Sequence, residues 1–160
     1  MPKTNAVRIL ESSSLKFRTV EYEVDESDLS AKSSAEKVGM PGEQVFKTLA
    51  VRGDRTGAFL VCIPGNLELS LKKAASASGN KSVQMLPLKE LEPLTGYVRG
   101  GCSPVGTKKR LAVYIDETAQ LFDEVSVSAG LRGLQMILAP DDLLAAVRLG
   151  NAGAQWADLV

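Results

Sequence analysis

Two apolar runs on either side of a short polar segment constrain the fold of this chain most strongly. The runs are VFKTLAV, residues 45–51, and AFLVCI, residues 58–63, and RGDRTG lies between them. Alternating apolar runs of this length are typical of strands, and Gly and Asp residues suit a tight reversal. The pattern predicts a β-hairpin.

Lys47 lies within the first of these strands, and its position needs an explanation. In an extended strand its side chain shares a face with those of Leu49 and Val51. Lysine is rarely fully buried without a partner, because removing its ammonium from water is costly. Two interpretations stay open at this point: an edge residue whose ammonium reaches solvent, or a cation placed in a partly enclosed pocket.

Shorter patterns predict several more helices and strands. Helices are expected where capping residues and glycine stops bound apolar periodicity, over residues 4–13, 33–39, 70–79, 87–94 and 140–149. Further strands are expected where apolar residues alternate, over residues 17–24, 82–86, 124–130 and 134–139. Residues 97–116 are expected to run as strand, exposed loop and strand. Short strands among short helices, without a regular βαβ repeat, indicate one α+β domain over residues 1–160 with a mixed sheet wrapped by helices.

The sequence contains no histidine, and this absence restricts its chemistry. Histidine is the usual base of Ser-His-Asp and Cys-His catalysis and the commonest proton donor near neutral pH. Cys62 and Cys102 lie far apart without a CxxC motif, so no metal site is expected. Catalysis would have to use Lys, Asp, Glu, Tyr, backbone dipoles or a group on the substrate.

Charge and hydropathy narrow the range of partners. The chain has 19 Lys and Arg against 19 Asp and Glu, which gives no general attraction to polyanions. Any contact with nucleic acid must therefore be local. No apolar run is long enough to span a bilayer, and the first residues lack a signal-peptide core. We expect a cytoplasmic protein.

The segment GGCSPVGTKKR, residues 100–110, is the most unusual in the chain. Gly100, Gly101 and Gly106 lack side chains and Pro104 stiffens the turn, so backbone N–H and C=O groups can approach a ligand closely. A bulge between two strands explains the same residues, and the spacing is not that of a P-loop. Cys102 has no histidine to activate it, so we do not expect a catalytic thiol.

Basic residues gather beside this loop. Arg99, Lys108, Lys109 and Arg110 could hold a phosphate backbone, although a short charged run is more often a solvated face. Arg132, in the segment SAGLRGLQM, could bind a phosphate or carboxylate, or lie in water at a turn.

Five motifs in order resemble the YbaK/EbsC family, the free-standing relatives of the editing insertion in bacterial prolyl-tRNA synthetases. They are VFKTL, LELSLKKAA, TGYVRGGCSPVGTKKR, IDETA and VSAGLRGL. The resemblance extends from the first expected helix to PDDLLAAV. It implies an α+β fold whose mixed, strongly curved and barrel-like β-sheet is wrapped by short helices.

The resemblance also implies an activity, namely trans-editing by an aminoacyl-tRNA deacylase. The implied reaction is hydrolysis of mischarged Cys-tRNA(Pro), because GGCSPVGTKK is similar to the cysteine-specific branch. The implied partners are mischarged tRNA(Pro) and prolyl-tRNA synthetase, with no cofactor and no metal. Alternatives are a deacylase for Ala-tRNA(Pro), a non-catalytic module that binds aminoacyl-tRNA or a synthetase, and a nucleotide-binding regulator.

The same resemblance implies a set of site residues. Lys47 would be the essential side chain, an anchoring cation instead of a base, while the thiolate of the substrate cysteine attacks its own ester. The implied substrate pocket comprises Tyr22, Gly100, Gly101, Cys102, Ser103, Pro104, Ser128, Gly130, Arg132 and Gln135. The basic residues Arg99, Lys108, Lys109 and Arg110 would contact tRNA. Gln135 departs from the family, which has an aspartate there, so a neutral amide replaces a carboxylate.

Overall fold

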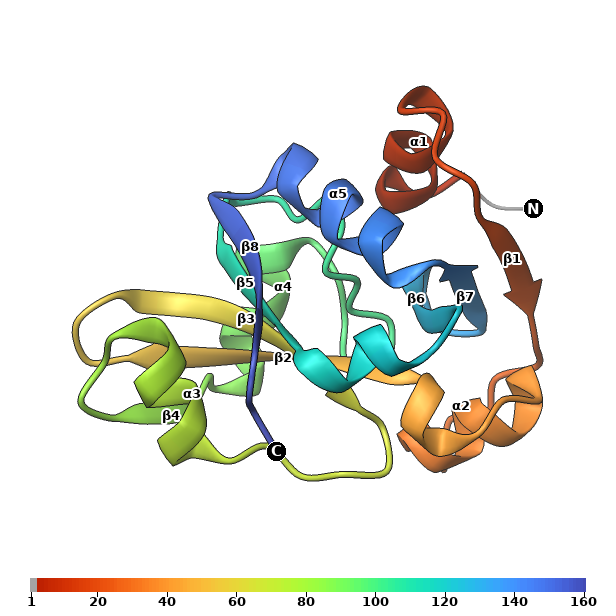
Figure 1. The fold of residues 1–160 in the computed structure, drawn as a ribbon. Coiled ribbons are helices and arrows are strands. Elements are labelled where there is room, and N and C mark those ends of the chain that lie inside the picture. Colours follow the sequence, from red (N-terminus) through yellow and green to blue (C-terminus); the bar gives the residue numbers. More distant parts are fainter. Residues whose placement is uncertain (1–2) are drawn as a thin grey trace.

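The structure is a computed structural model that describes residues 3–160 (Figure 1). Its helices and 3-10 turns are α1 (Asn5–Ser12), α2 (Ala31–Val38), η1 (Gly42–Gln44), α3 (Leu71–Ser78), η2 (Leu88–Glu90), α4 (Leu91–Thr95), η3 (Glu117–Leu121) and α5 (Pro140–Gly150). Its strands are β1 (Arg18–Glu21), β2 (Phe46–Gly53), β3 (Gly57–Pro64), β4 (Val83–Met85), β5 (Ala112–Asp116), β6 (Val125–Leu131), β7 (Leu134–Leu138) and β8 (Gly153–Ala157). The expected mixed α+β fold is confirmed.

The strands form two open sheets, so the expected barrel-like closure is wrong. One sheet has the order β1-β7-β6 and the other β4-β2-β3-β5-β8. They meet at a parallel bridge between Val45 and Ser126. The strand expected just before the glycine loop does not form, because Gly96 and Gly100 have φ values of 79° and 83° that interrupt an extended chain. The segment before the glycine loop therefore contributes no strand to either sheet, and both sheets stay open.

The predicted hairpin is confirmed as β2 and β3. The two strands pair antiparallel from Phe46 opposite Pro64 to Gly53 opposite Gly57. Apolar side chains cover both of its faces: Phe46 and Ala50 join a large core with α1, α5, β6 and β7, and residues of the opposite face join a smaller core with α3. Figure 1 shows β2 and β3 running through the middle of the molecule. Lys47 therefore lies on a largely covered strand.

Three of the expected helix starts and stops are found as predicted. The Thr4 hydroxyl accepts from the N–H of Val7 at the start of α1, and Ser70 caps α3 through Lys73 in the same way. Gly79 ends α3 in the left-handed conformation, with φ 76°.

The expected start of α2, with Ser33 as its cap, is wrong by three residues. Its cap is Ser30, whose hydroxyl accepts from the N–H of Ser33 at 3.2 Å, and Ser33 is not the cap itself. Both serines are followed by a plausible helical segment, so the sequence did not distinguish between them. Gly39 ends the helix as predicted.

The glycine loop is buried, although the sequence analysis expected an exposed loop. All seven residues from 101 to 107 are buried. Side chains from elsewhere satisfy its carbonyl groups: the Tyr97 hydroxyl donates to the Val105 carbonyl at 2.7 Å, and the Asn151 amide donates to the Pro104 carbonyl at 3.0 Å. Asn151 is 47 positions from Pro104, so local patterns could not reveal this contact. The strand expected after the loop does form, as β5.

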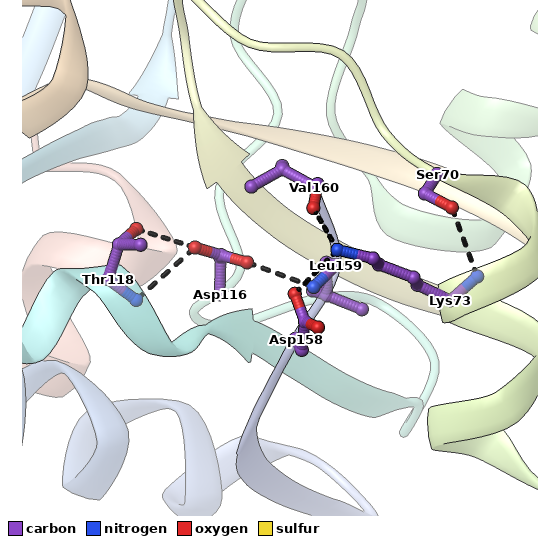
Figure 2. A network of polar contacts seen from close by, with 7 residues as sticks. All are labelled: Ser70, Lys73, Asp116, Thr118, Asp158, Leu159 and Val160. Atoms are coloured by element: carbon purple, nitrogen blue, oxygen red, sulfur yellow. Dashed lines mark hydrogen bonds and ion pairs between the residues drawn. The ribbon is translucent and has the colours of Figure 1, made fainter.

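The last residues form strand β8 and a buried network that the sequence analysis left unspecified. β8 pairs parallel with β5, from Ala112 opposite Gly153 onward. Figure 2 shows the buried carboxylate of Asp116 between the backbone N–H of Leu159, which donates at 3.0 Å, and the N–H and hydroxyl of Thr118. Leu159 itself is completely buried.

Candidate active site

A cavity of about 520 Å³ lies beside strand β2. Val45 and the first part of β2, up to residue 50, form one wall, and residues of the glycine loop, β6 and β7 also line the cavity. Residues of α2 and the preceding segment border the cavity, and apolar residues of β4, η2 and α4 complete it. The most informative lining residues are Lys32, Ser34, Lys47, Glu68, Met85, Leu88, Arg99, Gly100, Cys102, Ser128 and Gln135.

Lys47 is half-buried in this cavity and has no protein partner. Its ammonium forms no hydrogen bond or ion pair with any other residue between 3 and 160. Lys32 and Arg99 also line the cavity, against one carboxylate, that of Glu68. The site thus carries a positive excess in a chain that is neutral overall, which favours an anionic ligand.

Only part of the glycine loop lines the cavity. Gly100 and Cys102 line it, whereas Gly101, Ser103 and Pro104 are buried behind them. A Cβ on Gly101 would lie 2.9 Å from the backbone N of Arg132, so a glycine is required for the loop to approach the β6–β7 turn.

The Cys102 thiol at the cavity is unsuited to nucleophilic attack. Burial raises its pKa to about 11, so the thiol is neutral near pH 7. This agrees with the prediction that Cys102 is not catalytic.

Ser128 and Gln135 are brought together as expected. They are opposite each other in the register of β6 and β7, and both side chains line the cavity. The hydroxyl of Ser126 donates to Gln135 Oε1 at 2.8 Å, which fixes the amide. The Nε2 group is then left as a hydrogen-bond donor at the cavity without a protein partner among the described residues.

Arg132 and Tyr22 lie outside the walls of this cavity, next to a separate depression. Arg132 Nε donates to the carbonyl of Arg99 at 2.8 Å, and its guanidinium pairs with Glu26 at 2.9 Å. Arg132 thereby links the β6–β7 turn to the residue before the glycine loop. Because its guanidinium is taken up by these two contacts, it does not face the cavity. The Tyr22 hydroxyl is hydrogen-bonded to that of Ser34, which lines the cavity, at 3.2 Å.

Gly130 supports the site from behind. Its φ is 102°, and a Cβ there would lie 2.7 Å from the ring of Tyr97. Since Tyr97 holds the glycine loop through the carbonyls of Val105 and Gly106, Gly130 makes room for the residue that positions the loop.

The basic cluster beside the loop divides in two. Arg99 lines the cavity, whereas Lys108, Lys109 and Arg110 are exposed and lie outside its walls. Arg110 donates to the carbonyl of Asn151 at 3.0 Å.

Several lining residues escaped the sequence analysis. Lys32, Ser34 and Glu68 lie on segments whose own patterns describe only a helix or a turn, and Met85 and Leu88 fall in a short strand and a helical turn. No local signal distinguishes them, because they meet only through the tertiary fold.

Comparisons with known proteins define the class. Residues 26–146 match the aminoacyl-tRNA editing domain family. The chain belongs to this family, which confirms the resemblance seen in the sequence and the expectation of an aminoacyl-tRNA editing enzyme.

Individual relatives are consistent with this class. The chain is 50% identical, over 89% of its length and 87% of the relative, to EbsC of Enterococcus faecalis, a candidate Cys-tRNA(Pro)/Cys-tRNA(Cys) deacylase. It is 24% identical to the proline–tRNA ligase of Limosilactobacillus fermentum, over 81% of this chain but 25% of the ligase. A crystal structure of a candidate trans-editing enzyme for prolyl-tRNA synthetase superposes with a TM-score of 0.81 at 31% identity, covering 99% of this chain and 98% of the other.

Within residues 3–160, no helix is long and apolar enough to cross a membrane. No group of three or more His, Cys, Asp or Glu side chains in that range could hold a metal ion.

Proposed function

We propose that this protein hydrolyses the ester of mischarged Cys-tRNA(Pro) in trans. The observation that carries the proposal is the unpartnered ammonium of Lys47 in a cavity with a positive excess, in a chain without histidine. The 50% identity to a candidate Cys-tRNA(Pro) deacylase supports the choice of substrate. Because the proposed substrate is a charged tRNA, we also propose that the protein acts in the cytoplasm.

An aminoacyl ester is already activated, so positioning and charge stabilisation can supply most of the catalysis. Lys47 holds the phosphate or carbonyl side of the terminal aminoacyl-adenosine by charge, and the backbone of the glycine loop contacts its ribose. The free Nε2 of Gln135 is a neutral donor for the ester carbonyl. A carboxylate at this position could only accept a hydrogen bond when ionised, so glutamine changes the kind of contact that the site offers.

The substrate itself supplies the nucleophile. The thiolate sulfur of the esterified cysteine forms a bond to its own carbonyl carbon, the bond from that carbon to the ribose oxygen breaks, and the ribose oxygen takes up a proton. Water then opens the cyclic thioester to give free cysteine. A thiol is partly ionised at neutral pH whereas a serine hydroxyl is not, so the chemistry selects cysteine.

The remaining site residues act in support. Ser128, Gly100 and Cys102 shape the cavity, whereas Arg132, Tyr22 and Gly130 hold its walls. Arg99 contacts the end of the tRNA. The tRNA body, farther from the cavity, is contacted by Lys108, Lys109 and Arg110. Prolyl-tRNA synthetase is the partner that delivers the mischarged tRNA.

A panel of tRNA(Pro) charged with cysteine, alanine, serine or proline tests this function in single-turnover deacylation. We expect Cys-tRNA(Pro) to be hydrolysed fastest, by more than the roughly 10–200-fold that pocket size alone can supply over serine. Equal cleavage of the serine ester would exclude thiol-assisted attack. Fastest cleavage of the alanine ester would identify an alanine-type deacylase, and binding without turnover would identify a non-catalytic module.

A further inference from the structure

Six consecutive residues, Val45 and the first five residues of strand β2 up to Ala50, line the cavity. Side chains of a strand alternate between its two faces, so one face alone could contribute only every second residue. A cavity lined by consecutive residues must instead lie alongside the edge of the strand. It therefore faces the main chain of β2.

The pairing of the strands shows that this edge is open. β3 pairs with β2 along its whole length on one side, but on the other side β4 pairs only with Val51 to Gly53. The last hydrogen bond on that side runs from the N–H of Leu86 to the carbonyl of Ala50, at 3.0 Å. Beyond it, towards Thr48, no strand of the described sheets pairs with β2 in a ladder. Strand β6 also packs near β2, but the pairing between them is the single bridge of Val45 with Ser126.

The direction of the free groups follows from the antiparallel pattern. Main-chain groups of successive residues point to opposite sides. The carbonyl of Ala50 points to the β4 side, and that of Val45 to the β3 side, where it accepts from Gly65 at 2.8 Å. The C=O of Thr48 and the N–H of Ala50 thus point side by side towards the cavity, as one acceptor and one donor.

Apolar residues lie at the same end of the cavity. Met85 and Leu88 line it and remain 49% and 60% exposed, and Leu86 and Leu91 lie beside them. Exposed apolar side chains can pack against the face of a flat ring, and the unpaired main-chain groups beside them can hydrogen-bond its polar edge. An extended peptide would instead need a longer free edge than the one between Thr48 and Ala50.

We infer that this edge of β2 binds the terminal adenine of the substrate, through the C=O of Thr48 and the N–H of Ala50. Adenine has an amino donor next to a ring-nitrogen acceptor, which matches this acceptor and donor. Hypoxanthine and guanine have a carbonyl and a ring N–H at the same positions, which would oppose both protein groups. The choice of a terminal adenosine rests on the proposed function, but the match to the adenine edge rests on the strand alone.

Adenosine 5′-monophosphate (AMP) and inosine 5′-monophosphate (IMP) test the inference on the intact protein, because they differ only at this edge of the base. We expect AMP to bind at least about 10-fold more tightly than IMP, the discrimination typical of a two-point contact to a base edge. In amide hydrogen exchange, AMP should slow exchange at Ala50. Leu49 is the matched control, because its N–H already faces β3. Equal binding of AMP and IMP, or binding of AMP without protection of Ala50, would overturn the inference.

A second experiment separates this inference from the proposed function. The 3′-cysteinyl esters of adenosine and inosine are compared in deacylation. Hydrolysis of both at equal rates would refute the adenine contact and leave the deacylase intact. Preferential binding of AMP without hydrolysis of either ester would leave the adenine contact intact and refute the deacylase.

Discussion

Lys47 is the residue on which the proposed chemistry depends most directly. A half-buried ammonium without a partner contributes little to stability, because it gives up hydration and gains no ion pair. Such a placement is explained by a ligand that supplies the missing charge. At the residue scale, removing the Lys47 ammonium should therefore lower the deacylase activity and leave the free energy of unfolding almost unchanged.

Lys47→Ala should reduce single-turnover deacylation of Cys-tRNA(Pro) by about 100-fold or more, the usual effect of removing a group that stabilises developing charge. Its free energy of unfolding, measured in urea, should change by less than about 1 kcal/mol, because no protein contact of the ammonium is lost. Lys81→Ala is the control, since Lys81 is exposed and does not line the cavity. A Lys47→Ala variant with wild-type activity would remove Lys47 from the mechanism.

At the scale of elements, the glycine loop is held by Tyr97 just before it and by side chains of two distant segments. Tyr97, Asn151 and Arg132 each hydrogen-bond a carbonyl of the loop or of the residue before it. Its sequence predicts an exposed loop, because glycine, proline and lysine are typical of surface turns. Its burial depends on side chains that lie up to 47 positions away, which no local pattern contains.

Gly101→Ala should displace the loop and lower deacylation by about 10-fold or more, because the new Cβ would lie 2.9 Å from the backbone N of Arg132. Gly150→Ala is the matched control: its Cβ would make ordinary contacts at 3.8 Å and beyond, so activity should be unchanged. Rates of esterified-cysteine release by both variants provide the measurement. Equal activity of the two would show that the position of the loop does not matter to catalysis.

The C-terminal segment offers a second test at this scale, one of stability. Asp116 is 1% exposed and accepts from the N–H groups of Leu159 and Thr118 (Figure 2). Asp116→Ala leaves these donors unsatisfied, which should lower the free energy of unfolding by about 1–3 kcal/mol. Urea denaturation measures the loss, and Glu117→Ala, at an exposed neighbour, should cost much less. A similar loss in both variants would show that the network does not stabilise the fold.

At the scale of the whole molecule, three buried acidic groups set the behaviour at high pH. Burial is the main cause that raises the pKa of Cys62 and of Tyr97 to about 12 and that of Cys102 to about 11. Well below pH 9 each thiol is almost entirely protonated in both the folded and the unfolded protein. Above pH 9 the unfolded thiols lose their protons first, so stability must fall as pH rises.

The free energy of unfolding should decline from about pH 9 upward, by up to about 1.4 kcal/mol per pH unit for each thiol. Urea denaturation at several pH values between 8 and 11 measures the slope. The Cys62→Ala variant should have a lower stability throughout and a shallower slope above pH 9. An unchanged slope would mean that the Cys62 thiol does not titrate differently in the two states.

The neutral net charge leads to a prediction about tRNA binding. Three cations line the cavity, Lys32, Lys47 and Arg99, and the other basic residues are balanced over the molecule. Together with the proposed tRNA contacts Lys108, Lys109 and Arg110, these cations allow at most six phosphate contacts. The isolated protein should therefore bind tRNA(Pro) weakly, with a logarithmic salt dependence no steeper than about −4 to −5. Titration at several salt concentrations measures this slope. A slope steeper than about −5, or tight selective binding, would contradict the expected reliance on prolyl-tRNA synthetase.

Local patterns in the sequence were enough to predict the hairpin of β2 and β3, several helix ends, the family and the exclusion of histidine chemistry. These depend on alternation, capping residues, motif order and composition, all of which are local or additive properties of the chain. Long-range packing sets three other features: the sheets stay open, the glycine loop is buried, and Arg132 and Tyr22 support the cavity without lining it. It also decided that β2 presents a free main-chain edge to the cavity. That edge exists because β4 stops at Met85, and where one strand ends beside another is set by packing across the fold.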